Sequence, residues 1–400
     1  MPPTEPKGRK LKDWLDGLQF YVEETEAPRE WWMWGGIFTL CSALQRRVWL
    51  PYGIENVYPN LYVMLVGPPG TRKAGPIKLA KRLLLDLGLN VSVDSSSKRA
   101  LTKELAEISK VCFFEHNGKS RAQCPMAIIS PELSSLLAVD PKGMIEALTD
   151  LFDSPDKWQH ETSGEGKDYL HGVCLGCFLA TTPTWLAANL PQEAIGGGYT
   201  SRHVIVADSG IYKPVAIPDE MNPRLYKALR SDLNRVAMLS GEFTWGEGSR
   251  EFFTTWYDKA RLDRFKEIKD ERIHGFLSRI HIHALKTAMA LRVSYSDTLV
   301  LEPDDLDKAI TILDQTLEGL GRALGGHGRS ASAADVEKIL GQIKMNGSMS
   351  FTELLRINYH DTDKGELDKV MDTITALRYV EKSFDEAGKA IFKWIWKGDS

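Results

Sequence analysis

The sequence has few cysteines, no long apolar run and little net charge. Five cysteines are spread widely over 400 residues, which excludes a disulfide scaffold and favours a reducing cytoplasm. No apolar run reaches the roughly 18–20 residues of a membrane span, and residues Met1 to Lys12 lack the apolar segment of a secretion signal. A net charge of −4 excludes a uniformly basic nucleic-acid-binding surface but not a local one. We therefore expect a cytoplasmic protein that does not enter a membrane.

The composition is that of a globular chain with more than one domain. The hydrophobic share is 43% and the charged share 26%, both ordinary for folded proteins and unlike a largely disordered chain. At about 100–200 residues per domain, the length predicts two or three domains. The sequence pattern divides the chain into four parts, residues 1–60, 61–210, 211–325 and 333–400.

The first two parts differ in their expected secondary structure. Residues 1–60 are expected to be helical. Their aromatic group Trp31, Trp32 and Trp34 either packs against the next domain or forms a base-stacking platform. Residues 61–210 alternate strands and helices, which predicts a parallel sheet with crossovers. Its strands are expected at 61–66, 127–129, 173–181 and 203–207.

The last two parts are mostly helical. Residues 211–325 contain amphipathic helical patterns, and a flexible Gly- and Ser-rich linker is expected at 325–332. Residues 333–400 predict three helices followed by two strands. This order is the plan of a winged helix.

A glycine-rich loop after the first expected strand is the motif that carries chemistry. Its residues are Gly67-Pro68-Pro69-Gly70-Thr71-Arg72-Lys73-Ala74, and a helical pattern follows. The phosphate-binding pattern G-x-x-x-x-G-K-[S/T] is met at Gly67 and Lys73, whereas Arg72 replaces the second fixed glycine and Ala74 replaces the hydroxyl. Such a turn points backbone N–H groups at an anion, and the helix dipole adds to the attraction. We therefore predict that the loop binds the phosphates of a nucleotide, with Lys73 at the β and γ groups.

The loop and its flanks resemble a known family. Pro59-Asn60-Leu61-Tyr62 and the segment from Val66 to Lys73 are similar to phage and mobile-element ATPases, which are RecA/AAA-like P-loop proteins found near replication primases and helicases. Loops ending in Arg-Lys are common in that family. The resemblance implies a P-loop NTPase core of the α/β class with an N-terminal helical collar, an α-helical lid and a C-terminal winged helix. It also implies ATP and Mg²⁺ as cofactors.

The resemblance gives roles to residues that follow two later strands. Glu132 resembles the carboxylate of a Walker B strand that activates water and helps to hold Mg²⁺, while Pro131 stands where the first carboxylate would be. Thr181 or Thr182 resembles the sensor 1 residue, whose polar tip contacts the γ-phosphate or the attacking water. Glu132 and Thr182 are therefore candidate catalytic residues.

Two arginines also resemble functional residues of such ATPases. Arg202 follows a glycine loop and resembles an arginine finger, which neutralises charge on a nucleotide held by a neighbouring subunit. Arg279 opens an apolar helix and resembles the nucleotide-binding sensor 2 arginine of a lid. An arginine finger implies self-association, and a hexameric ring is expected.

Two regions are candidates for contact with DNA. A hairpin is expected around residues 163–166, and in hexameric helicases hairpins at this position point into the pore. A solvated hairpin without function is an equal alternative. The third helix of residues 333–400 is the other region, although acidic neighbours leave protein docking open. The basic candidates are Lys157, Lys167 and His171 at the hairpin, and Lys364, Lys369 and Arg378 near the helix.

The pair Cys174 and Cys177 forms a lone C-x-x-C pattern on an apolar strand. A zinc site needs a second pair of ligands. We therefore expect buried thiols rather than a metal or redox site.

These features predict an ATP-dependent DNA helicase or DNA-remodelling motor in phage or mobile-element replication. It would act as a ring, with single-stranded DNA in the pore and other replication proteins as partners. Two alternatives stay open. Ala74 and Pro131 favour a nucleotide-binding helicase loader or switch with little hydrolysis, and the winged-helix pattern favours a DNA-binding replication initiator.

Overall fold

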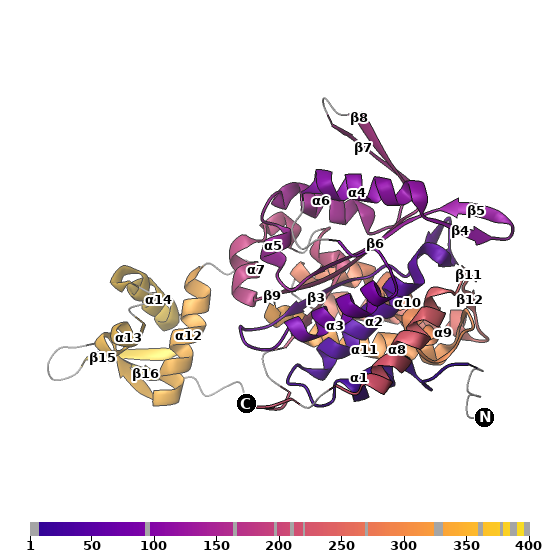
Figure 1. Ribbon diagram of the computed structural model, residues 1–400. Helices are drawn as coiled ribbons and strands as arrows, with labels where there is room; N and C mark the ends of the chain where they lie inside the picture. The colour runs from indigo at the N-terminus through magenta and orange to yellow at the C-terminus, as the bar shows by residue number, and fades with distance from the viewer. Residues whose placement is uncertain are drawn as a thin grey trace. The chain divides into compact units, whose positions relative to one another are not determined.

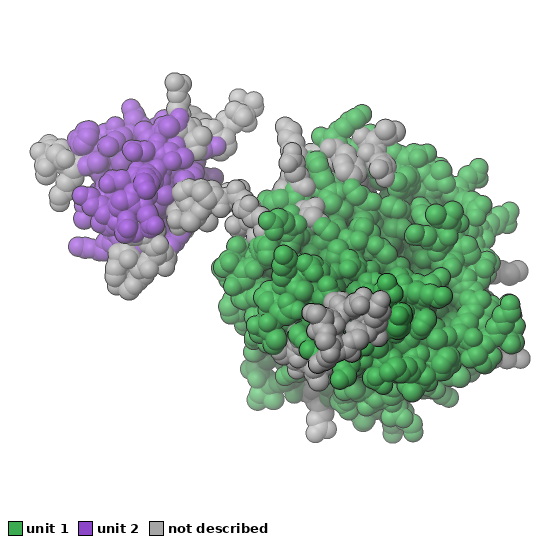
Figure 2. Space-filling view, turned by 90° about the horizontal axis from the view of Figure 1, so that it is seen from above, with its two compact units in different colours: residues 1–324 green, residues 325–400 purple. Residues whose placement is uncertain are grey.

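The computed structural model describes two compact units, residues 1–324 and 325–400, which Figure 2 colours separately. Each unit has a hydrophobic core of its own. The described residues are 8–92, 97–162, 166–195, 198–208, 212–218, 221–268, 271–323, 331–358, 363–376, 379–384 and 390–395.

A four-stranded parallel sheet is the centre of the first unit (Figure 1). In spatial order its strands are β10 (His203–Ala207), β3 (Tyr62–Val66), β9 (Val173–Thr181) and β6 (Cys124–Ser130). An isolated parallel bridge between Val91 and Ala127 continues the pairing beyond β6. The expected parallel sheet with crossovers is confirmed, and all four expected strands belong to it.

Helices cover both faces of this sheet, which explains why its strands are buried almost throughout and mostly apolar. The covering helices are α2 (Arg29–Leu44), α3 (Ala74–Asp86), α4 (Lys98–Val111), α6 (Pro141–Leu151), α10 (Glu271–Tyr295) and α11 (Pro303–Ala323). Figure 1 shows α2 and α3 on one side of the sheet and α4 and α6 on the other. Helix α10 packs on α2, and α11 packs on β10.

Shorter elements complete the first unit. Helices α1 (Trp14–Tyr21) and α8 (Pro223–Ala237) pack on α2, and α9 (Ser249–Glu267) packs on α10. Two short helices, α5 (Leu133–Leu136) and α7 (Pro183–Asn189), follow β6 and β9. Within the described ranges, no helix combines the length and the apolarity that a membrane crossing requires.

The three neighbouring tryptophans of α2 belong to the core. Trp31, Trp32 and Trp34 are at most 6% exposed, and Trp31 Nε1 donates a hydrogen bond of 3.1 Å to the Val206 carbonyl oxygen of β10. The packing interpretation is therefore correct. The base-stacking alternative is wrong, because all three rings are packed inside the hydrophobic core of the first unit.

The end of the segment 1–60 is not helical. It forms the antiparallel strands β1 (Val48–Tyr52) and β2 (Glu55–Val57), joined by a turn in which Gly53 has a φ of +66°. Pro51 cannot continue a helix, and β-favouring residues precede it. Strand β1 also pairs with the two-residue strand β11 (Gly241–Glu242), while β12 (Thr244–Trp245) pairs with β13 (Val300–Leu301).

Two antiparallel hairpins project from the first unit (Figure 1). The expected hairpin is confirmed as β7 (Lys157–Thr162) and β8 (Gly166–His171), and residues 163–165 of its turn lie outside the described residues. A second hairpin, β4 (Phe113–His116) and β5 (Lys119–Ala122), was not predicted.

The second unit combines three helices with a three-stranded antiparallel sheet of order β14-β16-β15. In chain order the elements are α12 (Ala331–Asn346), β14 (Ser348–Ser350), α13 (Phe351–Asn358), α14 (Lys364–Ala376), β15 (Val380–Phe384) and β16 (Ala390–Trp394). All three helices and the β15–β16 pair agree with the expected pattern, whereas β14 was missed. Of the expected linker, residues 325–330 lie outside the described residues, and α12 already begins at Ala331.

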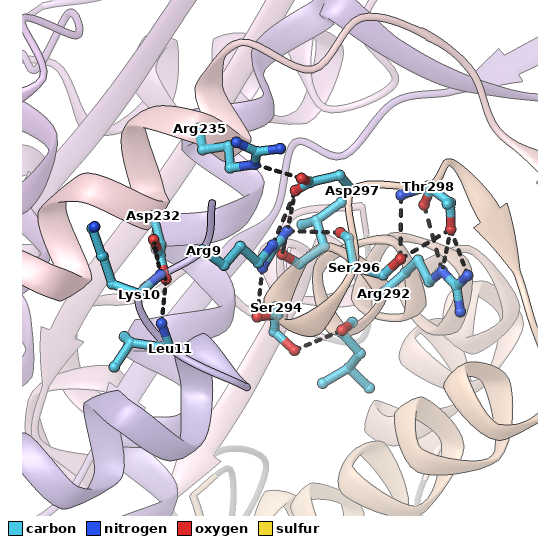
Figure 3. Close-up of polar contacts among 12 residues, drawn as sticks. Arg9, Lys10, Leu11, Asp232, Arg235, Arg292, Ser294, Ser296, Asp297 and Thr298 are labelled. Atoms are coloured by element: carbon cyan, nitrogen blue, oxygen red, sulfur yellow. Dashed lines mark hydrogen bonds and ion pairs between the residues drawn. The ribbon is translucent and has the colours of Figure 1, made fainter. Parts of the chain in front are cut away.

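Arg9 binds the amino-terminal segment to the end of α10 through hydrogen bonds and an ion pair (Figure 3). Its guanidinium donates to Asp297 Oδ1 at 2.6 Å and makes bonds of 2.7–2.9 Å to three backbone carbonyl oxygens, those of Val293, Ser294 and Ser296. The last carbonyl groups of a helix lack partners within the helix. Arg9 therefore caps α10, and its side chain is only 1% exposed.

We predict that Arg9→Ala lowers the free energy of unfolding by about 3 kcal/mol, because it leaves a carboxylate and several carbonyl groups with fewer donors. The pKa of Asp297 is lowered: burial raises it, but hydrogen bonds from Arg235 and Arg9 outweigh burial. The deficit should therefore be full above pH ~4 and shrink at lower pH. Urea unfolding measures both effects. Lys10→Ala, at an exposed neighbour, should change stability by less than about 0.5 kcal/mol; equal effects of the two variants would contradict the capping role.

Candidate nucleotide-binding site

The glycine-rich loop leaves the carboxyl end of β3, a central strand of the sheet. Val66 pairs with Thr181 of β9 on one side and with Ala207 of β10 on the other. The loop begins with a hydrogen bond of 3.3 Å from the Gly67 N–H to the Thr181 carbonyl oxygen. In open α/β sheets, ligands bind outside the carboxyl ends of the strands, where the strand order reverses. The loop lies at such a point.

Gly67 is in tight contact on two sides. A Cβ atom at this position would lie 2.6 Å from the Asp208 carbonyl oxygen and 2.9 Å from the Trp31 ring. Any larger residue would push either the backbone after β10 or the ring of α2. The fixed first glycine of the motif is thus required by close packing against both the Asp208 backbone and the Trp31 ring.

Arg72 keeps the backbone shape that a glycine would normally supply. Its φ is +64°, in the left-handed region that side chains other than glycine rarely adopt. The guanidinium Nε donates to Glu26 Oε2, and Glu26 Oε1 accepts a bond of 3.1 Å from the Val215 N–H. The hydrogen bond from Arg72, then that from Val215, lowers the pKa of Glu26. Arg72 therefore adopts the left-handed backbone conformation that favours glycine, and it adds a side chain that contacts Glu26.

Lys73 lies inside the loop. Its Nζ donates bonds of 2.6 Å to the carbonyl oxygens of Gly67 and Pro68, and burial lowers its pKa. Thr71 Oγ1 donates to the same Pro68 oxygen at 2.8 Å. Helix α3 begins at Ala74, and no described side chain caps its amino end. The first N–H groups of α3 and the Lys73 ammonium are the groups that attract phosphate.

A cavity of about 540 Å³ lies over the loop and brings together residues from three segments that the sequence had nominated. Its volume suits a nucleotide-sized ligand. The lining residues come from the loop and from the chain after β6 and β9: Pro69, Gly70, Arg72, Lys73, Ala74, Pro131, Glu132, Leu133, Ser134, Ala180, Thr181, Thr182 and Trp185.

The polar residues of this cavity differ in how firmly they are held. Glu132 is exposed, and its Oε2 accepts a bond of 3.3 Å from Ser134 Oγ. Thr182 Oγ1 caps α7 by accepting the Trp185 N–H at 3.2 Å. Thr181 is buried at the end of β9. Glu132 is the one carboxylate in the lining, and no three described His, Cys, Asp or Glu residues gather as metal ligands.

Arg202 and Arg279 lie together, away from the lining of this cavity. Both bind the exposed carboxylate of Asp153, Arg202 through Nη2 at 3.1 Å and Arg279 through Nη1 at 3.2 Å. One carboxylate between two guanidinium groups leaves a net positive charge. Asp153 and Glu26 were not nominated from the sequence, because each pairs with an arginine tens of residues away and nothing local marks it.

Two buried histidines hold the backbone turn that precedes and includes Arg202. The turn is the 3₁₀ helix η3 (Thr200–Arg202). His203 Nδ1 lies 2.9 Å from the Tyr199 carbonyl oxygen, and His283 Nε2 lies 3.0 Å from that of Ser201. Burial lowers the pKa of His203 to about 4 and that of His283 to about 3. Both rings are neutral at pH 7 and carry one N–H each. Because a carbonyl oxygen can only accept, that hydrogen lies on Nδ1 of His203 and on Nε2 of His283.

The nominated DNA-contact residues fall in three groups. Lys157 and His171 are exposed cross-strand partners at the base of the β7–β8 hairpin. Lys364 and Lys369 are exposed on α14, among exposed Glu366, Asp368 and Asp372. For Lys167 only the backbone in β8 is described, and Arg378 lies outside the described residues.

The C-x-x-C pair is buried, as expected. Cys174 and Cys177 are at most 5% exposed, and both thiols are free. Burial raises the pKa of Cys174 to about 11. Protonated, buried thiols on a central strand are packing residues.

The chain was compared with known proteins. No family model and no curated protein matches it. Among solved structures, a full-length MCM homolog from Methanopyrus kandleri aligns with 80% of this chain at 16% sequence identity and a TM-score of 0.44. The alignment spans 63% of that protein's length, so this chain covers less than two thirds of it.

We predict that Arg72→Gly is more stable than Arg72→Ala by about 1 kcal/mol, because only glycine adopts a φ of +64° without strain. Both variants lose the contact with Glu26, so the difference isolates the backbone. Thermal or urea unfolding measures it. At Arg82, in the middle of α3, the same two substitutions should have the opposite order by a similar amount. The same order at both positions would contradict the left-handed assignment.

Proposed function

We propose that the chain is an ATP-dependent DNA helicase or DNA-remodelling motor that acts as a ring, with a hexamer as the expected form, in the replication of a phage or mobile element. The observation that carries the ATPase part is the cavity of about 540 Å³ at the carboxyl end of β3. It joins the glycine loop and Lys73 to a carboxylate after β6 and two threonines after β9. These are the groups that phosphoryl transfer uses: hydrogen-bond donors that hold the phosphates, a carboxylate that orients the attacking water, and a hydroxyl that contacts the γ-phosphate.

In this proposal, Lys73 turns from the loop carbonyl groups to the β- and γ-phosphates. The loop N–H groups hold the phosphates, Glu132 orients the attacking water, and Thr181 or Thr182 contacts the γ-phosphate. The residues fit a weakly held Mg²⁺. Ala74 supplies no hydroxyl and Pro131 no carboxylate, so Glu132 would be the protein's acidic ligand, and the phosphates of the nucleotide and water would supply the other ligands.

The arginine pair supports assembly. Arg202 and Arg279 do not line the cavity of their own chain. They both bind the exposed carboxylate of Asp153, so both guanidinium groups lie near the surface. We propose that both reach the γ-phosphate of a neighbouring subunit, where Asp153 gives way to the phosphate. A ring follows if each subunit supplies the pair to the next.

A second candidate, a nucleotide-dependent loader or switch with little hydrolysis, is favoured by Ala74 and Pro131. A poorly positioned metal slows phosphoryl transfer, which depends on positioning. The second unit fits either candidate as a winged helix that docks DNA or protein, since basic and acidic side chains are mixed on the exposed side of α14. ATP turnover with and without single-stranded DNA decides: stimulation by DNA supports the motor, and binding without turnover supports the switch.

We predict that Lys73→Ala weakens ATP binding at least tenfold, about 1.4 kcal/mol, because the loop loses its only lysine. Isothermal titration calorimetry measures the affinity. Lys78→Ala, at an exposed position one turn further along α3, is the control and should bind ATP like the unaltered chain. If Lys73→Ala binds ATP with unchanged affinity, the assignment of residues 67–74 as a phosphate-binding loop is wrong.

We predict that Arg202→Ala still binds ATP but loses most turnover, by about 10³-fold or more. Mixed with Lys73→Ala, it should regain part of the activity, because a hybrid interface can pair an intact loop with an intact arginine. Turnover is measured across mixing ratios. If the mixture stays inactive while both variants assemble, Arg202 does not act in trans.

A further inference from the structure

A second cavity, separate from the nucleotide site, lies where the two hairpins leave the first unit. Its volume is about 240 Å³, and three aromatic residues from three segments line it: Trp49 of β1, Tyr58 after β2 and Phe114 of β4. Arg46 and Arg121 are the basic residues of the lining, and Asp156, Ala122, His171 and Gly172 complete it. We propose that this cavity binds one unstacked base of single-stranded nucleic acid, and that the rim binds the adjoining phosphates. The proposal rests on the DNA-dependent function proposed above and names a site for it.

Two of the three aromatic rings lie against guanidinium groups, and Trp49 and Phe114 are largely buried in the wall of the cavity. The Arg46 guanidinium lies over the Tyr58 ring at 3.8 Å, and the Arg121 guanidinium lies over the Trp49 ring at 5.1 Å. The His116 ring meets Trp49 edge-on at 4.8 Å. Alternating aromatic rings and guanidinium planes are the surfaces on which single-stranded bases stack. The cavity is also below the ~300–1,000 Å³ of pockets for drug-sized ligands, which suits a single base.

The hairpin register places basic residues on the side of β4–β5 that faces Trp49. Phe114 pairs with Arg121 and His116 pairs with Lys119, so these four share one face of the hairpin. Glu115 and Ser120 form the next pair and point to the opposite face. The alternation therefore separates the exposed basic side chains from the hairpin's own carboxylate.

The charge left at the cavity is positive. Arg46 is buried, and its guanidinium is satisfied by Asp156 and by the carbonyl oxygens of Ser154 and Val173. Arg121 is exposed and forms no ion pair with any residue that the structure describes. Lys157 lies beside His171 on the neighbouring hairpin, and both are exposed. With Asp156 matched by Arg46, these side chains are free to meet phosphates.

The test compares two oligonucleotides of about 12 nucleotides, within the ~4–16 that such sites cover. One is oligothymidine, and the other has abasic residues in place of the bases, so that both carry the same phosphate charge. Fluorescence anisotropy with the full chain gives the two affinities. We expect the base-bearing strand to bind at least about fivefold more tightly, and we expect Tyr58→Ala to abolish most of this difference while Tyr58→Phe retains it.

Arg121→Ala should weaken both strands and reduce the dependence of binding on salt between about 50 and 200 mM. Lys110→Ala is the matched control, because it removes one exposed positive charge that already pairs with Glu107 on α4. It should leave both affinities and the salt dependence unchanged. Photo-crosslinking of a 5-iodouridine strand to the unaltered chain should label peptides that contain Tyr58, Trp49 or Phe114, a readout that does not depend on any variant folding.

Equal affinity for base-bearing and abasic strands would overturn the proposal, as would a base preference that Tyr58→Ala leaves intact. Displacement of the strand by a proline-rich peptide would instead assign the cavity to a protein ligand. These outcomes are distinct from failure of the ATPase proposal. That proposal fails if Lys73→Ala binds ATP normally, whereas the base pocket fails if the unaltered chain binds ATP but shows no preference for bases.

Discussion

The contact between Trp31 and Gly67 is the constraint around which the first unit is arranged. The Trp31 ring lies against the start of the loop, and its Nε1 donates to the Val206 carbonyl oxygen of β10. Trp32, the next residue of α2, lies against Gly75 at the start of α3. Helix α2 thus contacts the loop at both of its ends. Through these two tryptophans it packs against β10, against the loop and against the start of α3. Close-packed interiors transmit strain, so a displacement of the loop would be transmitted to α2 in the core.

The parts of the fold that could be predicted are those whose signal lies in a few consecutive residues. Strands β3, β9 and β10 are buried on both faces, so each is a short apolar run that the sequence shows directly. The glycine loop could be recognised for the same reason, because its motif lies within eight consecutive residues. Glu132 and the two threonines were nominated through the resemblance to Walker B and sensor 1 strands. They line one cavity with the loop because the carboxyl ends of parallel strands share one edge of the sheet.

The parts that were missed depend on distant partners or on a signal passed over. Asp153 joins arginines 49 and 126 residues away, and no pattern around it marks that pairing. The β4–β5 hairpin did carry a signal: Asn117 and Gly118 both have positive φ, as the tightest hairpin turn requires, and Asn-Gly is its usual sequence. Its strands mix charged and aromatic residues, which hid the pattern. Strand β14, three residues long, pairs only with a strand some 40 residues later, which one sequence does not reveal.

The Arg9 cap has a consequence for synthesis on the ribosome. Arg9 and Asp297 are 288 residues apart. At about 5–20 residues per second, roughly 15–60 s pass between the making of the two. During that interval the sheet, loop and hairpins can emerge and collapse while Arg9 lacks Asp297 and the last carbonyl groups of α10. Helix α10 receives its cap only after its own last turn has left the exit tunnel. The contact between Arg9 and α10 therefore forms late in the synthesis of the first unit, and of that unit's described elements only the short strand β13 and α11 follow it.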